Sequence, residues 1–237
     1  MEIVFLEKGS LGNDLDLSYF SELGHVTFYE LTKPEEVPER IRDADVIIVN
    51  KIPMNEATLS GASHLKLVAL TATGMNNIDF DYTNSHGIQV KNVAGYSTNA
   101  VAQHTFALLF YVLHRLAYYD NYVKSGAYCT NPGFSHFDEK FSELDGKTWG
   151  IVGMGAIGQR VASIAEAFGC HVIYYSTSRR NTDQPYERVD FEELLKRSDV
   201  ISLHAPLNPD TEGIMNREAF RKMKKSAFLV NVARGRL

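Results

Sequence analysis

Three glycines stand at a spacing that could bind a dinucleotide. Gly153, Gly155 and Gly158 form the pattern GxGxxG, directly after the apolar run 149–152 and before an amphipathic segment. The first glycine of such a turn permits a tight bend, the second lets the backbone approach a pyrophosphate, and the third lets helix and strand pack closely. The strand, turn and helix of one βαβ unit are the context that this motif requires, so it predicts dinucleotide binding. The alternative is a glycine-rich turn with a structural role only.

The residues after this motif bear on the choice of cofactor. Ala156 and Ile157 begin the expected helix and would line the phosphate site. About 20 residues after the motif, an NAD site usually carries Asp or Glu for the ribose 2′-OH. Here the chain has Ser176, followed by the hydroxyl and arginine run 177–180, which includes Arg179. These groups could hold a 2′-phosphate, so we expect NAD or NADP, with NADP favoured. The alternative is a solvated loop with surface arginines.

Short apolar runs that alternate with helix-length segments must position these residues. The runs are β-branched and show little alternation, as strands buried on both faces of a parallel sheet do. They lie at 2–6, 25–29, 45–50, 66–71, 88–91, 149–153, 171–175, 199–203 and 226–231. This order predicts an α/β fold with two doubly wound parallel-sheet domains.

A long helix-forming segment, 97–124, separates the strands into two groups. We therefore expect one domain over residues 1–98 and a second over 99–237, which the chain enters through this hinge helix. The first resembles a flavodoxin-like domain, and the second resembles a Rossmann domain.

Four separated motifs, in conserved order, carry a family resemblance. They are the GxGxxG turn, "TATGMNNID" (71–79), "NVAGYSTNAVAQHTFALL" (92–109) and "VISLHAPLNPDTEGIMNREAFRKMKKSAFLVNVARG" (200–235). From about residue 40 to the end, the chain resembles the D-isomer-specific 2-hydroxyacid dehydrogenases. Residues 1–40 fit only as general βα structure. The resemblance implies reversible hydride transfer between a nicotinamide and a small 2-oxo acid, with hydroxypyruvate/glycerate slightly favoured over lactate or phosphoglycerate chemistry.

The resemblance also implies roles for particular residues. Arg234 matches the catalytic arginine, which could grip a carboxylate or stabilise charge on the 2-oxo oxygen. The backbone N–H groups of Thr73, Gly74 and Met75 would hold the substrate carboxylate, and Tyr96 would contact substrate or be an ordinary packed aromatic. Other matched positions would line the cofactor groove: Ala205, Pro206, Thr211, Val232 and Ala233. His204 would have a structural or cofactor-edge role, and we assign no metal ligands.

The family's remaining catalytic groups are an acid/base histidine and an orienting carboxylate, both downstream of the arginine. The sequence ends three residues after Arg234. We therefore expect a C-terminally incomplete chain that would be nearly inactive in hydride transfer by itself. The last elements of both domains would be missing, which would expose an edge strand and lower stability.

Composition excludes several other functions. A net charge of −5 without a long basic block argues against nucleic-acid binding. The longest apolar runs are too short to span a membrane, and the N-terminus is a poor signal peptide. Cys129 and Cys170 form no CxxC, so we expect reduced thiols in the cytoplasm.

By resemblance we expect a homodimer that pairs through the cofactor domain. The competing hypotheses are a non-catalytic, dinucleotide-responsive regulator on the same fold and, less favoured, a degenerate gene product without function.

Overall fold

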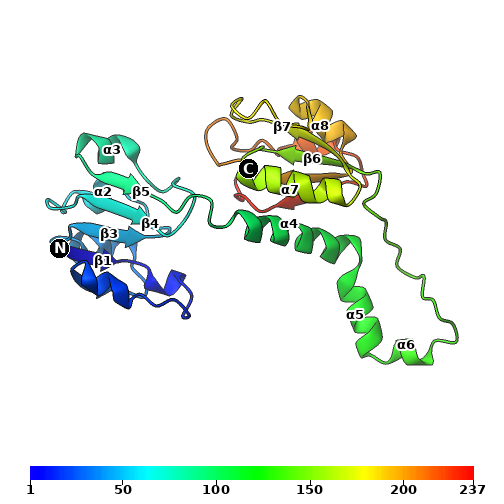
Figure 1. The fold of residues 1–237 in the computed structure, drawn as a ribbon, viewed down its shortest axis with the longest axis horizontal. Coiled ribbons are helices and arrows are strands. Elements are labelled where there is room, and N and C mark those ends of the chain that lie inside the picture. Colours follow the sequence, from blue (N-terminus) through cyan, green and yellow to red (C-terminus); the bar gives the residue numbers. More distant parts are fainter. The chain divides into compact units, whose positions relative to one another are not determined.

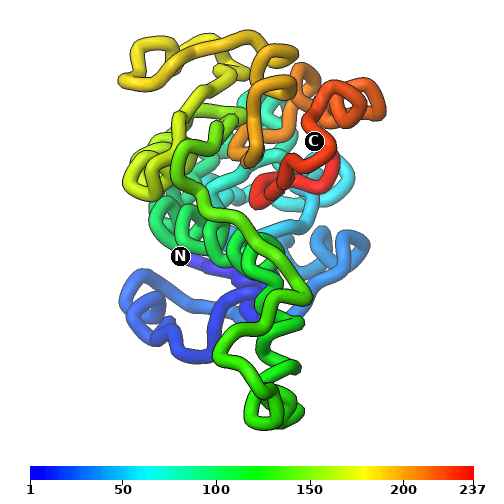
Figure 2. Tube along the Cα trace, turned by 90° about the vertical axis from the view of Figure 1, so that its right-hand side faces the viewer, coloured from blue at the N-terminus to red at the C-terminus, as the bar shows by residue number.

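The chain divides into two compact units, each built on one parallel sheet. A computed structural model describes residues 1–237, and the units are residues 1–96 and 97–237. Each sheet has five strands. Figure 1 labels several of them, and Figure 2 draws the same chain coloured from blue at the N-terminus to red at the C-terminus. The expected α/β fold with two doubly wound parallel sheets is confirmed.

The first unit has the strand order β2-β1-β3-β4-β5. This is the order of flavodoxin-like folds, in which the order of the parallel strands reverses between β1 and β3. Its elements are β1 (Glu2–Phe5), η1 (Lys8–Ser10), η2 (Ser18–Glu22), β2 (His25–Phe28), η3 (Pro34–Glu36), α1 (Val37–Arg40), β3 (Val46–Val49), α2 (Glu56–Leu59), β4 (Leu67–Leu70), α3 (Phe80–Ser85) and β5 (Gln89–Lys91).

The central strands of this unit are buried on both faces. Ile3 and Phe5 of β1 belong to one core cluster, while Val4 and the following Leu6 belong to the other. Successive residues of a strand point to opposite faces, so both faces of the sheet are covered. This explains why the strand runs in the sequence are continuously apolar.

The second unit has the strand order β10-β9-β6-β7-β8, and the order of its parallel strands reverses between β6 and β9. Two core clusters lie on opposite faces of this sheet. Its elements are α4 (Thr98–Leu113), α5 (Leu116–Lys124), α6 (Ala127–Thr130), β6 (Thr148–Val152), α7 (Ala156–Ala167), β7 (His171–Tyr175), β8 (Glu187–Arg188), α8 (Phe191–Arg197), β9 (Val200–Leu203), α9 (Arg217–Lys222) and β10 (Phe228–Asn231).

The single helix expected over 97–124 is wrong, because the chain breaks it in two. Arg115 has φ 53°, in the left-handed region, and α5 starts anew after it. The His114 ring at the break stacks on Phe141, with ring centroids 4.8 Å apart. In Figure 1, α5, α6 and the connection back to β6 extend away from the sheet of their unit. This contact comes from a residue far along the chain, so local apolar periodicity could not reveal the break.

Nine of the ten strands coincide with the runs expected from sequence. The strand not expected is β8, two exposed polar residues that pair in parallel with β7. No helix in the structure combines the length and the apolar character needed to cross a bilayer.

Candidate functional site

The glycine turn after β6 is held too tightly for side chains at two of its three glycines. Gly153 has φ 95°, and a Cβ there would lie 2.7 Å from the Ala205 backbone nitrogen. A Cβ on Gly158 would overlap the Gly153 carbonyl oxygen. The turn is fixed to the neighbouring strand because the Gly153 N–H donates to the Tyr175 carbonyl over 2.9 Å. Close packing therefore requires glycine at both of these positions.

The middle glycine differs, because a Cβ on Gly155 would meet no atom within 4 Å. Gly155 is the N-cap of the twelve-residue helix α7, and the Gln159 N–H is bonded back to the Gly155 carbonyl over 2.9 Å. The helical residues before Gln159, Ala156 and Ile157 among them, therefore have N–H groups without an intrahelical acceptor. The turn thus presents free donors and open space together, as an anion site requires.

Ser176 lies at the carboxyl end of β7, next to this turn. The residue is 3 % exposed, and its hydroxyl oxygen is buried without a hydrogen-bond partner. Arg179 is exposed, has φ 57°, and makes no ion pair among those of this structure. Both residues follow β7, the strand end at which a dinucleotide site reads the ribose 2′-position of its adenosine.

The loop after β9 carries three of the expected groove residues. Ala205 is buried against Gly153, Pro206 is exposed, and Thr211 is buried. The Thr211 hydroxyl donates to the Pro206 carbonyl over 2.6 Å and accepts from the Asn208 N–H over 2.9 Å. Thr211 therefore fixes the shape of this loop from within.

His204 begins this loop and is placed unusually for a histidine. Both ring nitrogens are buried without a hydrogen-bond partner, and burial lowers the pKa of the ring to about 4. The ring is therefore neutral near pH 7. Sequence reasoning gave His204 only a structural or cofactor-edge role.

Arg234 lies in a turn that the side chain of Asn231 organises. The Asn231 carboxamide accepts the Ala233 N–H over 3.0 Å and donates to the Arg234 carbonyl over 3.0 Å. The Arg234 guanidinium donates to the Ala233 carbonyl over 3.0 Å. Sequence reasoning did not single out Asn231, although it begins the matched "NVARG" run and its spacing to Arg234 was the available signal.

Beside this turn lies an open cavity of about 500 Å³. Val232 and Ala233 line it together with residues of α4, among them His104. His104 was assigned no role from the sequence, because its place opposite Val232 depends on the packing of α4 on β10. The turns after β6, β9 and β10 share the carboxyl edge of one parallel sheet, since these strands are neighbours.

In the first unit, the expected carboxylate loop follows β4. The Thr73 hydroxyl donates to the Val93 carbonyl over 3.0 Å, and the Asn92 carboxamide donates to the Thr73 carbonyl over 2.7 Å. The backbone N–H groups of Thr73, Gly74 and Met75 take no part in the backbone hydrogen-bond pattern. The loop is thus braced through its side chains and carbonyls while its N–H groups stay available. Asn92 was not singled out from the sequence.

Tyr96 is the last residue of this unit and is 64 % exposed. A packed core aromatic would be buried, so this structure gives Tyr96 no packing role within its own unit. Its substrate contact stays a prediction.

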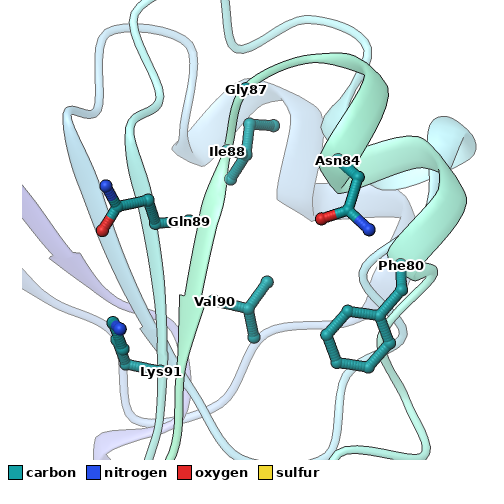
Figure 3. Close-up of a pocket in the computed structure, with 7 residues that line it drawn as sticks. All are labelled: Phe80, Asn84, Gly87, Ile88, Gln89, Val90 and Lys91. Atoms are coloured by element: carbon teal, nitrogen blue, oxygen red, sulfur yellow. The ribbon is translucent and has the colours of Figure 1, made fainter.

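A second open cavity in this unit, of about 360 Å³, lies at the edge strand β5. Figure 3 shows Val90 pointing toward Phe80 of α3, while Gln89 and Lys91 point the other way. None of the predicted site residues lines this cavity.

The cofactor-side residues fit a dinucleotide. Buried side-chain polar atoms without partners occur at Ser176 and His204 only, which follow the two strands that flank β6. Burying such atoms unpaired costs free energy, which a polar ligand recovers. Ser176 and Arg179 would face its ribose side, and the turn from Gly153 to Gly158 would hold its diphosphate.

Comparison with known proteins agrees with this geometry. Residues 106–237 match the family described as D-isomer specific 2-hydroxyacid dehydrogenase, NAD binding domain. The chain is 38 % identical to a hydroxypyruvate reductase of Blautia hydrogenotrophica, over 100 % of this chain and 76 % of that protein. It is 37 % identical to a glycerate dehydrogenase of Methylorubrum extorquens, over 100 % of this chain and 73 % of that protein.

Solved structures are similar over the same span. An acyclic imino acid reductase in complex with NADPH and D-Arg matches with a TM-score of 0.88 and 33 % identity, over 100 % of this chain and 75 % of that one. D-Lactate dehydrogenase from Aquifex aeolicus, complexed with NAD and lactic acid, matches with a TM-score of 0.85 and 30 % identity, over 99 % and 69 %.

Proposed function

This chain belongs to the D-isomer-specific 2-hydroxyacid dehydrogenase family, and from that premise we propose that it carries the cofactor site and substrate-binding residues of an NAD(P)-dependent D-2-hydroxyacid dehydrogenase acting on a small 2-oxo acid. Relatives named hydroxypyruvate reductase and glycerate dehydrogenase support hydroxypyruvate/glycerate as the substrate pair. One observation carries the proposal: the turn from Gly153 to Gly158 and the turn of Arg234 lie at the same edge of one sheet. We keep the reducing cytoplasm as its location, since Cys129 and Cys170 are free thiols.

Each residue has a physical task in this proposal. The N–H groups of Thr73, Gly74 and Met75 would bind the substrate carboxylate as a set of fixed dipoles. Arg234 would stabilise the negative charge that develops on the 2-oxo oxygen, because a guanidinium keeps its charge at any physiological pH. When bound, the nicotinamide supplies or accepts the hydride. Asn231 would keep Arg234 oriented through its two hydrogen bonds within the turn.

We propose NADP as the preferred cofactor. An acidic residue at the end of β7 would repel a 2′-phosphate, and this chain has Ser176 there with Arg179 nearby. The likeness to a structure that binds NADPH supports this choice, while the likeness to one that binds NAD leaves the preference to measurement.

The test measures the binding of both dinucleotides and asks whether one substitution reverses the preference between them. Isothermal titration calorimetry measures the dissociation constants of both dinucleotides. We expect NADP⁺ to bind tighter than NAD⁺, and Ser176→Asp to reverse the order by about tenfold or more, equal to about 1.4 kcal/mol. Arg188→Asp, at the exposed end of β8, is the matched control. Absence of binding by either dinucleotide would refute the cofactor site.

We further propose that the 237-residue polypeptide, assayed by itself, reduces hydroxypyruvate slowly. By the family resemblance the acid/base histidine would lie downstream of Arg234, so we expect no group of that kind within residues 1–237 to supply the carbonyl proton. His104 provides the sharpest internal check, because it lines the cavity beside Val232. Turnover at an ordinary rate that His104→Asn abolishes would overturn the proposal and make His104 the proton donor.

The second unit would also provide a homodimer surface. The outer faces of α4 and α5 and the connection after them expose large apolar side chains: Leu108, Tyr111, Val112, Leu116, Val123, Tyr128, Phe134, Phe137 and Phe141. Exposed apolar groups gathered in one region indicate an interaction surface. We expect Val112→Asp to shift the molecular mass in light scattering from dimer to monomer. Leu31→Asp, at an exposed apolar site of the first unit, should leave the mass unchanged.

A further inference from the structure

The side chain of Asn77 fastens the end of the loop that follows β4. The Asn77 carboxamide donates to the Ile52 carbonyl over 2.8 Å and to the Asn50 carbonyl over 3.5 Å. The Asn77 carbonyl accepts the Met54 N–H over 2.8 Å, and Met54 pairs with Ile78 in an isolated parallel bridge. The loop after β4 is thus tied to the segment after β3, the neighbouring strand of the sheet.

The segment after β3 is itself held by Glu7. The Glu7 carboxylate accepts the N–H groups of Asn50, Lys51 and Ile52 over 2.7, 2.8 and 3.2 Å. The peptide group between Asn50 and Lys51 therefore bonds Glu7 through its N–H and Asn77 through its carbonyl. Hydrogen bonds at both ends of one peptide group polarise it and strengthen one another. Glu7 and Asn77 are accordingly joined through the backbone of residues 50–52.

The start of the loop is fixed by other bonds, toward the β5 side. The Asn92 carboxamide donates to the Thr73 carbonyl over 2.7 Å, and the Thr73 hydroxyl donates to the Val93 carbonyl over 3.0 Å. After these bonds come the backbone N–H groups of Thr73, Gly74 and Met75, which take no part in the backbone hydrogen-bond pattern. The three donors therefore lie in a stretch that is fastened at both of its ends.

Fastening matters because a carboxylate is bound well only by donors that already stand in place. A binding group must be held within about 0.5 Å of its productive position, and a displacement of about 1 Å can cost up to a hundredfold. Donors that are fixed in advance also lose no free energy to reorganisation when the ligand arrives. The bonds of Asn77 are the loop's side-chain link toward β3, so their loss would free that end of the loop.

We propose that Glu7 and Asn77 are positioning residues for the substrate carboxylate. Neither touches the substrate: Glu7 fixes residues 50–52, these residues hold Asn77, and Asn77 holds the loop that carries the N–H donors. This inference rests on the proposed role of those N–H groups and adds the network that orients them. Its consequence is that Glu7, at the end of a different strand, controls the affinity for a carboxylate.

The measurement is an NMR titration of the amide signals of residues 73–75 with hydroxypyruvate, without a dinucleotide. Dihydroxyacetone is the control ligand, because it carries a hydroxymethyl group in place of the carboxylate. We expect hydroxypyruvate to shift these signals in a saturable way and dihydroxyacetone to leave them in place. The dissociation constant of the parent protein is the reference for every variant.

The first comparison changes Asn77 alone. Asn77→Leu keeps a similar shape and removes the donor, so we expect the dissociation constant for hydroxypyruvate to rise about tenfold, as loss of about one hydrogen bond implies. Asn77→His should restore affinity to within about threefold of the parent, because its Nδ1–H stands as many bonds from the backbone as the carboxamide nitrogen does. Asn84→Ala, at an exposed asparagine of α3, is the matched control and should change nothing.

The second comparison tests the link between the two residues. Glu7→Gln keeps the shape and removes the charge that strengthens the bonds to residues 50–52. We expect it to raise the dissociation constant about threefold in the parent protein and to add nothing in the Asn77→Leu variant, because the connection is already cut there. Glu30→Gln, which changes an exposed partner of Lys8, should leave the affinity unchanged in both backgrounds.

Each other outcome overturns the inference. Parent-like affinity in Asn77→Leu would show that the loop is positioned without Asn77, and weak binding by Asn77→His would show that shape and not the donor matters. Full additivity of Glu7→Gln and Asn77→Leu would break the link between them. If Asn77→Leu does not fold, Asn77→Ala replaces it, and failure of both to fold would make Asn77 a folding residue only. If hydroxypyruvate does not shift residues 73–75 of the parent protein, the proposed carboxylate role of the loop fails, which differs from a loss confined to the variants.

Discussion

The crevice at which the strand order reverses differs between the two sheets of this protein. In the first unit the strand order reverses between β1 and β3, and there the Glu7 carboxylate accepts the N–H groups of Asn50, Lys51 and Ile52 over 2.7, 2.8 and 3.2 Å. In the second unit the order reverses between β6 and β9. No carboxylate enters that crevice; Gly153 and His204 lie there, and polar atoms remain unpaired.

The difference shows how one architecture gives a closed and an open crevice. Backbone N–H groups at the carboxyl ends of parallel strands attract an anion. Where the chain supplies its own carboxylate, as at Glu7, the crevice is a structural link. Where it supplies none, as at Gly153, the crevice has room for the cofactor that we propose. The candidate substrate loop of the first unit accordingly lies elsewhere, after β4, at Thr73 to Met75.

The strongest way to break this comparison is to fill the open crevice. Gly153→Ala should destabilise the second unit by about 3 to 4 kcal/mol, combining a left-handed backbone with a clash against Ala205. It should also abolish dinucleotide binding. Urea denaturation followed by Trp149 fluorescence measures the first effect.

Gly87→Ala is the control for that substitution. Gly87 has φ 68° in the first unit, but a Cβ there would meet no atom within 4 Å. Its cost should be about 1 kcal/mol, the backbone part alone. Equal costs at the two glycines would show that the crevice at Gly153 is not tightly packed.

The next effect concerns pH. The pKa of His204 is lowered to about 4 in the folded chain, against about 6.5 when unfolded. Between these values, acidification protonates the unfolded chain and not the native one, so the free energy of unfolding falls as pH drops from about 6.5 to 4. The total loss should be about 3 kcal/mol.

Carboxylates titrate in part of the same range, so the measurement is the difference between the parent protein and His204→Phe in urea denaturation at a series of pH values. The parent should lose more stability than the variant between pH 6.5 and 4. Parallel curves would mean that His204 is not buried as a neutral ring.

A smaller effect is expected when the closed crevice is opened. Glu7→Ala should lower the free energy of unfolding of the first unit by about 2 kcal/mol, since charged hydrogen bonds to three backbone donors are lost. Hydrogen exchange of residues 50–52 should accelerate. Glu30→Ala, which removes only an exposed ion pair with Lys8, should change stability by less than about 1 kcal/mol. Unchanged exchange at 50–52 would refute the carboxylate link.

The smallest effect tests the opposite edge of the second sheet, where a buried polar group is paired. Cys170 donates to the Leu144 carbonyl over 3.4 Å, and burial raises the pKa of its thiol to about 11. Iodoacetamide should therefore modify exposed Cys129 and leave Cys170 unmodified until the chain unfolds. Mass spectrometry of the Cys129→Ser variant would show no label on the folded protein. Labelling of Cys170 at the rate of Cys129 would contradict this burial.

The sequence was sufficient for features that depend on neighbouring residues. Nine strands were predicted because a strand buried on both faces must be a continuous apolar run. The turn at Gly153 was predicted because its glycines and the helix after it are contiguous. The family followed from motifs that keep their order. Strand β8 was missed because two polar residues become a strand only when β7 lies beside them.

The tertiary structure alone decided which polar atoms have partners. The sequence places Glu7, His204 and Ser176 after strands, but it does not show that the Glu7 carboxylate meets the N–H groups of residues 50–52. Nor does it show that the ring nitrogens of His204 have no hydrogen-bond partner. It could not place the break at Arg115 either, which accompanies a contact between His114 and Phe141. Hydrogen bonding and burial join groups that are far apart along the chain, and such distances are fixed only when the sheets and helices pack.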